Sequence, residues 1–417
     1  MWSPFRQPVS VLSLLCAAVL AGCGGGGDAG STTGGSSAQA QSLSDVAALG
    51  QLIFTDTNLS KSGVQSCASC HDAGHAHAAP NNLSVQLGGP LGTDRHGTRV
   101  SPSMRYLRYN TDFHFDAEGT PTGGFFWDGR AKSLADQAKG PFVNPREMAN
   151  DRPEDVVAKV AQGAYAQEFK RVFGAGIFAD PAAAYERIAL ALQAFQQEDA
   201  QFAPFTSKYD AFLRGQTKLS DQELRGLALF NSPSKGNCAA CHPSGKGRNG
   251  SLPLFTDFSY DGLGVPRNWT ISDNVDPTVF DLGLCDSRHP VITALDETTR
   301  QGLCGKFKVP SLRNVAQRGA FFHNGVFHDL TTVVTFYAQR ETHPEKWYLD
   351  ANGQVDRDVN GQVNKYNDLP LAYRNKDHVN TTEAPYNRTL GDAPALTDAE
   401  IQDLVVFLGT LSDGWSH

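Results

Sequence analysis

The sequence predicts a mainly α-helical protein made of two similar modules in tandem, joined and covered by long loops. Three observations support this fold class. Apolar residues recur at helical spacing in several segments, whereas alternating patterns typical of strands are scarce. One cysteine and histidine motif occurs twice, each time after a helical segment that ends in a short polar loop. Finally, 41 glycines and 22 prolines among 417 residues indicate extensive loops.

Composition and charge exclude several classes of protein. Hydrophobic residues make up 40% of the chain and charged residues 19%, which is too polar for a multi-span membrane protein and too apolar for a disordered one. The formal net charge is −8. A nucleic-acid-binding protein would need a basic face, so no nucleic-acid partner is expected.

The first residues have the pattern of an export signal. Arg6 precedes an apolar run from Val9 to Leu20, which is too short to span a membrane. The run ends in Leu-Ala-Gly-Cys23, which resembles the lipobox of bacterial lipoproteins, whose cysteine becomes lipidated. We therefore expect a signal peptide over residues 1–22, a lipid on Cys23 and a flexible, Gly- and Ser-rich tether over residues 23–44. The alternative is an ordinary secretory signal with an incidental cysteine.

These features predict a periplasmic protein. The lipid would hold it to a membrane, most simply the outer membrane, and no other membrane contact is expected.

Two motifs have the form Cys-x-x-Cys-His. They are Cys67, Cys70 and His71, and Cys238, Cys241 and His242. This is the attachment signature of c-type haem, because two thioethers reach the vinyl groups while the adjacent histidine ligates the iron. Two covalently bound haem c groups are therefore predicted, with both histidines as axial ligands. The alternatives are redox-active dithiols or halves of a zinc site, although zinc sites have no fixed histidine after the second cysteine.

Two further cysteines follow the second motif. Covalent haem attachment implies an oxidising compartment, where a disulfide between Cys285 and Cys304 is the default expectation. Two buried free thiols are the alternative.

The segments before the motifs resemble each other. Leu49–His71 and Leu224–His242 both contain an apolar helical stripe, a phenylalanine and a loop rich in Ser, Lys and Gly. The second helix opens with the capping box Ser220-x-x-Glu223. This order of helix, haem motif and loops is that of a cytochrome c domain.

Each module also needs a closing helix. Asp180-Pro181 is a cap followed by proline, and it precedes one apolar face: Tyr185, Ile188, Leu192 and Phe195. The capping box Thr397-x-x-Glu400 precedes a second such face: Ile401, Leu404, Val405 and Leu408. We therefore predict haem domains over residues 45–210 and 211–417, with the boundary near residues 204–217.

The segment between the motifs, together with two later ones, carries a resemblance to a known family. Residues 125–148 read FFWDGRAKSLADQAKGPFVNPREM, and the second module contains VPSLRNV from Val309 and FHNG from Phe322. Over about residues 45–412 the chain resembles the bacterial di-haem cytochrome c peroxidases and their MauG-type relatives. The resemblance implies an oxidoreductase that reduces hydrogen peroxide at the N-terminal haem, with electrons delivered through the C-terminal haem.

The resemblance assigns four catalytic positions. Glu147 falls where the family keeps its acid–base carboxyl, which takes a proton from peroxide and returns it to the leaving oxygen. Gln137 and Pro141 fall where the family lines the same pocket, and Trp127 occupies the position of the inter-haem relay. The alternatives are a solvated surface glutamate and ordinary packing of the other three residues.

The sixth ligand of the second haem separates the subfamilies. The methionines are Met1, Met104 and Met148, so none follows His242 to serve as the usual ligand. Where relatives of the MauG type place a ligating tyrosine, this chain has Tyr337. A phenolate stabilises ferric iron and lowers its reduction potential relative to methionine. The alternative is a tyrosine that packs in a helix.

The distal side of the first haem is less defined. The resemblance implies a vacant or water-filled site, although His75, His77 and His96 follow on the next loop and His96 is the best candidate for a resting ligand. The family also places calcium between the haems. Here Val100 replaces the asparagine that binds calcium in the family, which argues against a calcium site. The remaining ligands are backbone carbonyls, so calcium binding stays an alternative.

Three functions follow from this reading. The first is a peroxidase whose electron donor is a small cytochrome c or cupredoxin. The second is a MauG-like oxidase that uses peroxide to modify tryptophan or tyrosine of a partner protein. The third is a di-haem electron carrier without peroxide chemistry, and Glu147 argues against it because a carrier needs no acid–base group.

Overall fold

The computed structural model describes residues 42–247, 249–286 and 288–416. The described residues from 43 onward form one compact unit. The predicted signal peptide, Cys23 and nearly all of the predicted tether lie outside the described residues. No helix in the described part of the chain is both long enough and apolar enough to span a membrane.

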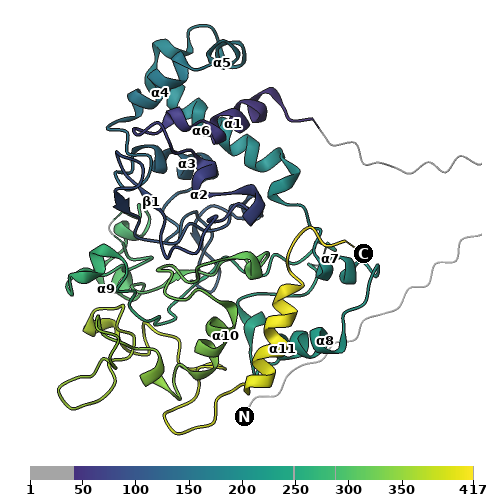
Figure 1. The fold of residues 1–417 in the computed structure, drawn as a ribbon, viewed down its shortest axis with the longest axis vertical. Helices are drawn as coiled ribbons and strands as arrows, with labels where there is room; N and C mark the ends of the chain where they lie inside the picture. Colours follow the sequence, from purple (N-terminus) through teal and green to yellow (C-terminus); the bar gives the residue numbers. More distant parts are fainter. Residues whose placement is uncertain (1–41, 248, 287, 417) are drawn as a thin grey trace, which may run out of the picture. The chain divides into compact units, whose positions relative to one another are not determined.

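The described residues are mainly helical, which confirms the predicted fold class (Figure 1). The helices are α1 Asp45–Thr55, α2 Cys67–Cys70, α3 Leu134–Val143, α4 Pro153–Gln162, α5 Ala166–Phe173, α6 Pro181–Glu198, α7 Lys208–Leu213, α8 Asp221–Asn231, α9 Glu297–Gln301, α10 Leu330–Gln339 and α11 Asp398–Gly409. The strands form three short antiparallel pairs: β1 Leu87–Gly88 with β2 Arg95–His96, β3 His114–Phe115 with β4 Pro121–Thr122, and β5 Tyr260–Asp261 with β6 Phe307–Lys308.

The first helical core lies in the N-terminal half. Helix α6 packs against α1, α3 and α4, and its predicted apolar face is buried. Asp180 caps this helix as expected, because its side chain accepts a hydrogen bond from the Ala183 backbone N–H and Pro181 occupies the first turn. Long loops hold α2, with its cysteines, under α1.

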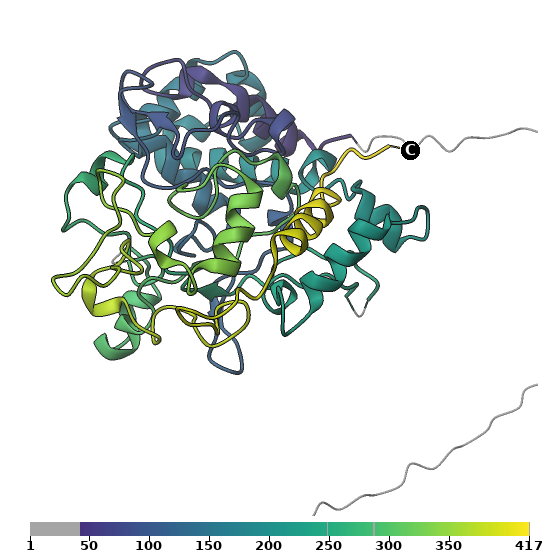
Figure 2. The ribbon, with the colours of Figure 1, turned by 60° about the horizontal axis from the view of Figure 1, so that its bottom comes forward.

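The second core repeats this plan in the C-terminal half. Helices α8 and α11 pack together (Figure 2). Both predicted capping boxes are present at their N-termini. The predicted apolar face of α11 is correct except at one position. Val405 is only half-buried, whereas Phe407 is fully buried because its ring packs edge-on against Phe230 and Tyr209.

Each helix pair crosses at a glycine. A side chain on Gly50 of α1 would collide with the Ala191 carbonyl of α6, and one on Gly226 of α8 would collide with the Asp403 carbonyl of α11. Both glycines stand four residues before a buried phenylalanine, Phe54 or Phe230. The two modules therefore use the same close helix contact at the same place in their sequences.

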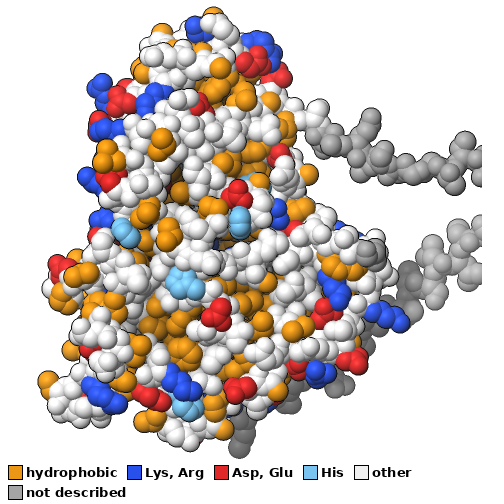
Figure 3. Space-filling model, viewed as in Figure 1, with side chains coloured by type: hydrophobic (Ala, Val, Ile, Leu, Met, Phe, Trp, Pro, Cys, Tyr) orange, Lys and Arg blue, Asp and Glu red, His pale blue; other side chains and the backbone are white. Residues whose placement is uncertain are grey.

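The two cores meet around α7. Phe202 belongs to the first core, and Tyr209 packs in the second. We propose that the domain boundary lies between these two residues. Across the junction, the Tyr106 hydroxyl of the first half donates to Asp413 near the C-terminus at 2.7 Å, and Arg105 pairs with the same carboxylate at 3.2 Å. On the face shown in Figure 3, acidic and basic side chains are interspersed.

Candidate functional site: two histidine centres

The two motif histidines have the same local geometry. The Nδ1 atom of His71 lies 3.2 Å from the His77 carbonyl oxygen, and Nδ1 of His242 lies 2.8 Å from the Phe255 carbonyl oxygen. A carbonyl can only accept, so each Nδ1 carries the proton and each Nε2 keeps its lone pair for a metal. Burial lowers the pKa of both histidines, which favours the neutral, ligating form.

The four motif cysteines are not paired with one another. Burial raises the pKa of Cys67, Cys238 and Cys241 to about 12, and that of Cys70 to about 11. Reactive dithiols need a lowered pKa, so this environment disfavours the redox-dithiol alternative. Among the described residues, no group of three or more His, Cys, Asp or Glu side chains converges as a metal site would require.

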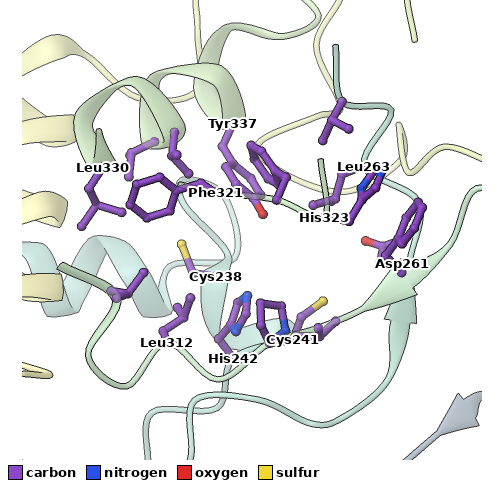
Figure 4. Close-up of a pocket in the computed structure, with 18 of the residues that line it drawn as sticks. Cys238, Cys241, His242, Asp261, Leu263, Leu312, Phe321, His323, Leu330 and Tyr337 are labelled. Atoms are coloured by element: carbon purple, nitrogen blue, oxygen red, sulfur yellow. The ribbon is translucent and has the colours of Figure 1, made fainter. Parts of the chain in front are cut away.

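A large cavity surrounds the second motif. Cys238, Cys241 and His242 lie on one side of it, and Tyr337 of α10 projects into it from the opposite side (Figure 4). Much of the remaining lining is apolar: Leu312, Phe321, Leu330, Val333, Val334 and Leu404. Two thiols at one edge, a histidine on one face and apolar walls fit a porphyrin attached through thioethers.

Tyr337 is held by α10, which begins at the Asp329 cap. Its ring lies 5.7 Å from that of Tyr386, which lines the same cavity. Burial raises the pKa of the Tyr337 phenol, so it is protonated unless a cation binds its oxygen. His323 also lines this cavity, but its ring stacks on Phe307 at 3.5 Å.

Glu147 lies beside the first motif. Burial is the largest cause of the raised pKa of Cys67 and Cys70, and the negative charge of Glu147 contributes to both. The side chain is half-buried, and its Oε1 accepts a hydrogen bond from the Asn144 side chain at 2.6 Å. Burial raises the pKa of Glu147, while the hydrogen bond from Asn144 and the charge of Arg130 act in the opposite direction.

The backbone around Glu147 is fixed by close packing. Any side chain at Gly88 would collide with the backbone at Arg146 and Glu147, and the Gly89 N–H donates to the Glu147 carbonyl at 2.8 Å. Gln137 and Pro141 are both half-buried on α3, one turn apart, and the Pro141 carbonyl accepts a hydrogen bond from the Met148 N–H at 3.2 Å. The structure therefore links Pro141 directly to the segment that carries Glu147.

Trp127 lies at the cavity of the second centre and is hydrogen-bonded to the segment that begins at Val100. Its indole Nε1 donates to the Val100 carbonyl at 2.9 Å, and the side chain lines the cavity around His242. Pro102, two residues after Val100, also lines this cavity, and the Met104 N–H donates at 3.0 Å to the His77 carbonyl that faces Nδ1 of His71. The segment from Val100 to Met104 thus links the surroundings of the two histidine centres.

An ion-pair network around the Trp127 loop was not predicted from the sequence. Asp128 is fully buried and accepts from Arg99 at 2.7 Å and Arg130 at 2.8 Å, and Arg99 also pairs with Asp281 at 2.6 Å. The Trp-Asp-Gly-Arg run alone could have drawn attention to Asp128. Its partners at residues 99 and 281 could not be predicted, because only the fold brings them together.

The loop histidines lie in different environments. His75 is exposed and pairs with Asp72 at 2.8 Å. His77 is buried and stacks on Phe202 at 4.1 Å, whereas His96, on β2, is exposed. None of these contacts identifies a distal ligand for the first centre. Cys285 and Cys304 are bonded to each other and buried, and calcium stays an untested prediction.

Comparison with known proteins finds di-haem peroxidases and MauG proteins as relatives. A family model described as di-haem cytochrome c peroxidase matches residues 44–218. Methylamine utilization protein MauG of Paracoccus denitrificans is 34% identical, covering 91% of this chain and 92% of that protein. Cytochrome c551 peroxidase of Nitrosomonas europaea is 32% identical, covering 67% of this chain and 69% of that protein.

A solved structure extends the comparison to the fold. The diheme peroxidase BthA from Burkholderia thailandensis is 39% identical, with a TM-score of 0.79 over 92% of this chain and 90% of that chain. The chain thus has two haem-attachment motifs with the same histidine geometry, and it is similar to di-haem peroxidases over nearly its whole length. The protein belongs to the di-haem cytochrome c peroxidase family, and is a peroxidase-type oxidoreductase that uses two haem cofactors.

Proposed function

We propose that this protein is a periplasmic di-haem c-type peroxidase, lipid-anchored through Cys23. Hydrogen peroxide is reduced at the His71 centre, and electrons from a small cytochrome c or cupredoxin enter through the His242 centre. The observation that supports this division of roles is the position of Glu147, a half-buried glutamate at the first motif, in the register where the family keeps its acid–base carboxyl.

The residues hold the cofactors in a defined way. Cys67, Cys70 and His71 would bind one haem, and the equivalent residues 238, 241 and 242 the other, with Tyr337 on the second iron. When bound, the haems supply the iron at which peroxide is reduced and the electron transfer that feeds it. Glu147 takes a proton from peroxide and returns it to the departing oxygen. Trp127 donates to the backbone segment that links the surroundings of the two centres and would assist electron transfer between them.

A MauG-like activity is the second candidate. Tyr337 favours it, because this phenol projects into the second cavity opposite His242, where no methionine is present among the lining residues. The substrate in this case would be tryptophan or tyrosine of a partner protein rather than a small electron donor.

The test uses the purified, haem-loaded protein. Mass spectrometry after denaturation should find two haems on the polypeptide, and hydrogen peroxide should be consumed as a reduced small cytochrome c or cupredoxin is oxidised. Glu147→Gln should lower this turnover, whereas Glu186→Gln, an exposed glutamate on α6, should not. Failure of every donor, combined with peroxide-dependent oxidation of a protein partner, would favour the MauG-like activity instead. If a protein with two haems showed neither activity, a di-haem electron carrier without peroxide chemistry would be the remaining function.

A further inference from the structure

Arg318 is a half-buried cation that the proposed mechanism does not use. It follows the short 3₁₀ turn Val315–Gln317 and lines the cavity around His242. Its Nη2 donates to the Ser311 carbonyl at 2.6 Å and, weakly, to the Arg313 carbonyl at 3.4 Å. Its Nε is inaccessible to solvent and has no hydrogen-bond partner in the structure.

Other buried arginines of this protein contrast with Arg318. Arg313 lies 2.8 Å from Asp210, Arg340 lies 2.7 Å from Glu341, and Arg99 lies 2.7 Å from Asp128. Within the described residues, no carboxylate lies within 4 Å of the Arg318 guanidinium. Burial lowers the pKa of Arg318 to about 10, with no anion compensating, so the group is still charged at neutral pH. An unpaired buried charge is costly, which points to an anionic partner from outside the chain.

The cavity itself suggests where that anion would lie. Cys238 and Cys241 fix the thioether edge of a porphyrin, and the two propionate carboxylates leave from the opposite edge. Asp261 lies on the Cys241 side of the cavity, where a further carboxylate would be repelled (Figure 4). Arg318 enters the lining of the cavity from a different segment, the one that follows the turn Val315–Gln317.

Arg318 also lies at the contact between the two modules. The next residue, Gly319, packs so closely against Asn81 and Asn82 of the first half that a side chain there would collide with them. Ala78 and Ala79 of the same loop line the cavity together with Arg318. The guanidinium is therefore placed on the side of the second cavity that faces the first module.

We propose that Arg318 binds a propionate carboxylate of the haem attached at Cys238 and Cys241, through a charge-assisted hydrogen bond from Nε. This inference rests on the proposed haem attachment at the second motif. An ionised propionate beside a guanidinium is stabilised in its charged form, and the cation offsets its negative charge near the iron. Arg318 is thus a positioning residue that raises the reduction potential of the second haem and makes it independent of pH.

Spectroelectrochemical titration of the haem-loaded protein tests this role, because it resolves each haem and does not depend on turnover. Arg318→Gln should shift the second haem to a more negative potential at neutral pH. It should also make that potential vary with pH between about 5 and 8, as the propionate becomes easier to protonate. Arg318→Lys keeps the charge and should retain most of the wild-type potential. Arg214→Gln removes the same charge from an exposed arginine of the same module, whose Nη1 donates to the Phe205 carbonyl, and should change neither quantity.

Several results would overturn the assignment. Identical potentials in Arg318→Gln and Arg214→Gln would do so, as would a shift confined to the first haem. If the glutamine variant does not fold, a crystal structure of the haem-loaded wild-type protein decides the question, because a propionate oxygen must lie within hydrogen-bond distance of the guanidinium. A protein with haem only at the first motif would instead disprove the proposed attachment, which the mass spectrum reports separately.

Discussion

At the scale of single residues, Glu147 and Tyr337 carry the functional proposal. Each is placed by its own element: Glu147 by the loop after α3, and Tyr337 by α10. Each faces a different histidine centre, so their roles can be separated by substitution.

Replacing Glu147 with glutamine should slow the peroxide step by about 10²-fold or more, because a positioned acid–base group is lost. Burial raises the pKa of Glu147, so the wild-type rate should fall on the acidic side as pH drops through a value above the ordinary glutamate pKa of about 4.3. Stopped-flow kinetics as a function of pH measure both effects.

Asn144 provides the matched control. Its hydrogen bond lowers the pKa of Glu147. Asn144→Ala should therefore move the fall of the rate at low pH (the acidic limb of the pH–rate profile) to higher pH without removing it. An acidic limb that persists unchanged in Glu147→Gln would assign the proton transfer to another group.

Tyr337→Phe should change the optical and EPR spectra of the second haem only, because the phenol oxygen is lost and an open or water-bound site remains. Tyr337→Met should raise the potential of that haem, since methionine stabilises ferric iron less than phenolate does. Tyr386→Phe is the control, as this buried phenol lines the same cavity. If Tyr386→Phe opened the site and Tyr337→Phe did not, the ligand would be Tyr386.

At the scale of helices, the repeated glycine crossing holds each module together. Gly226 allows α8 to approach α11 at Asp403, and Gly50 does the same for α1 and α6. Glycine is otherwise a poor helix former, so its presence at both crossings reflects this contact.

Gly226→Ala should destabilise the protein by about 1–3 kcal/mol, because the added methyl group overpacks the helix contact. Gly409→Ala is the matched control: this glycine ends α11, a methyl group added there would meet no other atom within 4 Å, and the change should be neutral or stabilising by up to about 1 kcal/mol. Urea denaturation measures both, and equal midpoints for the two variants would rule out the proposed contact.

At the scale of the whole molecule, buried ion pairs connect distant segments. Arg313 makes two hydrogen bonds to Asp210, at 2.8 and 2.9 Å, and both side chains are almost completely buried. This pair ties α7 to the segment before the FHNG turn, 103 residues later in the chain.

Asp210→Asn should destabilise the protein by about 3–5 kcal/mol, because Arg313 would be left buried without its counter-charge. The pKa of Asp210 is lowered in the folded state, so the stabilisation is complete above the unfolded aspartate pKa of about 3.9 and is lost as pH falls through the lower folded value. Asp151→Asn breaks an exposed pair with Lys61 and should cost at most about 1 kcal/mol. Denaturation at several pH values tests this, and a similar loss for both variants would contradict it.

The sequence by itself predicted the helical class, the capped helices and the two histidine motifs, because caps, helical periodicity and the Cys-x-x-Cys-His spacing are local properties of the chain. The tertiary structure decided what is not local. It buried Phe407 in place of Val405 and joined Arg99 to Asp281. It also placed Arg318 at the second cavity with no carboxylate paired to its guanidinium. Such contacts depend on which loops come together when the two cores pack. A local sequence pattern does not predict contacts between segments that are far apart in the chain.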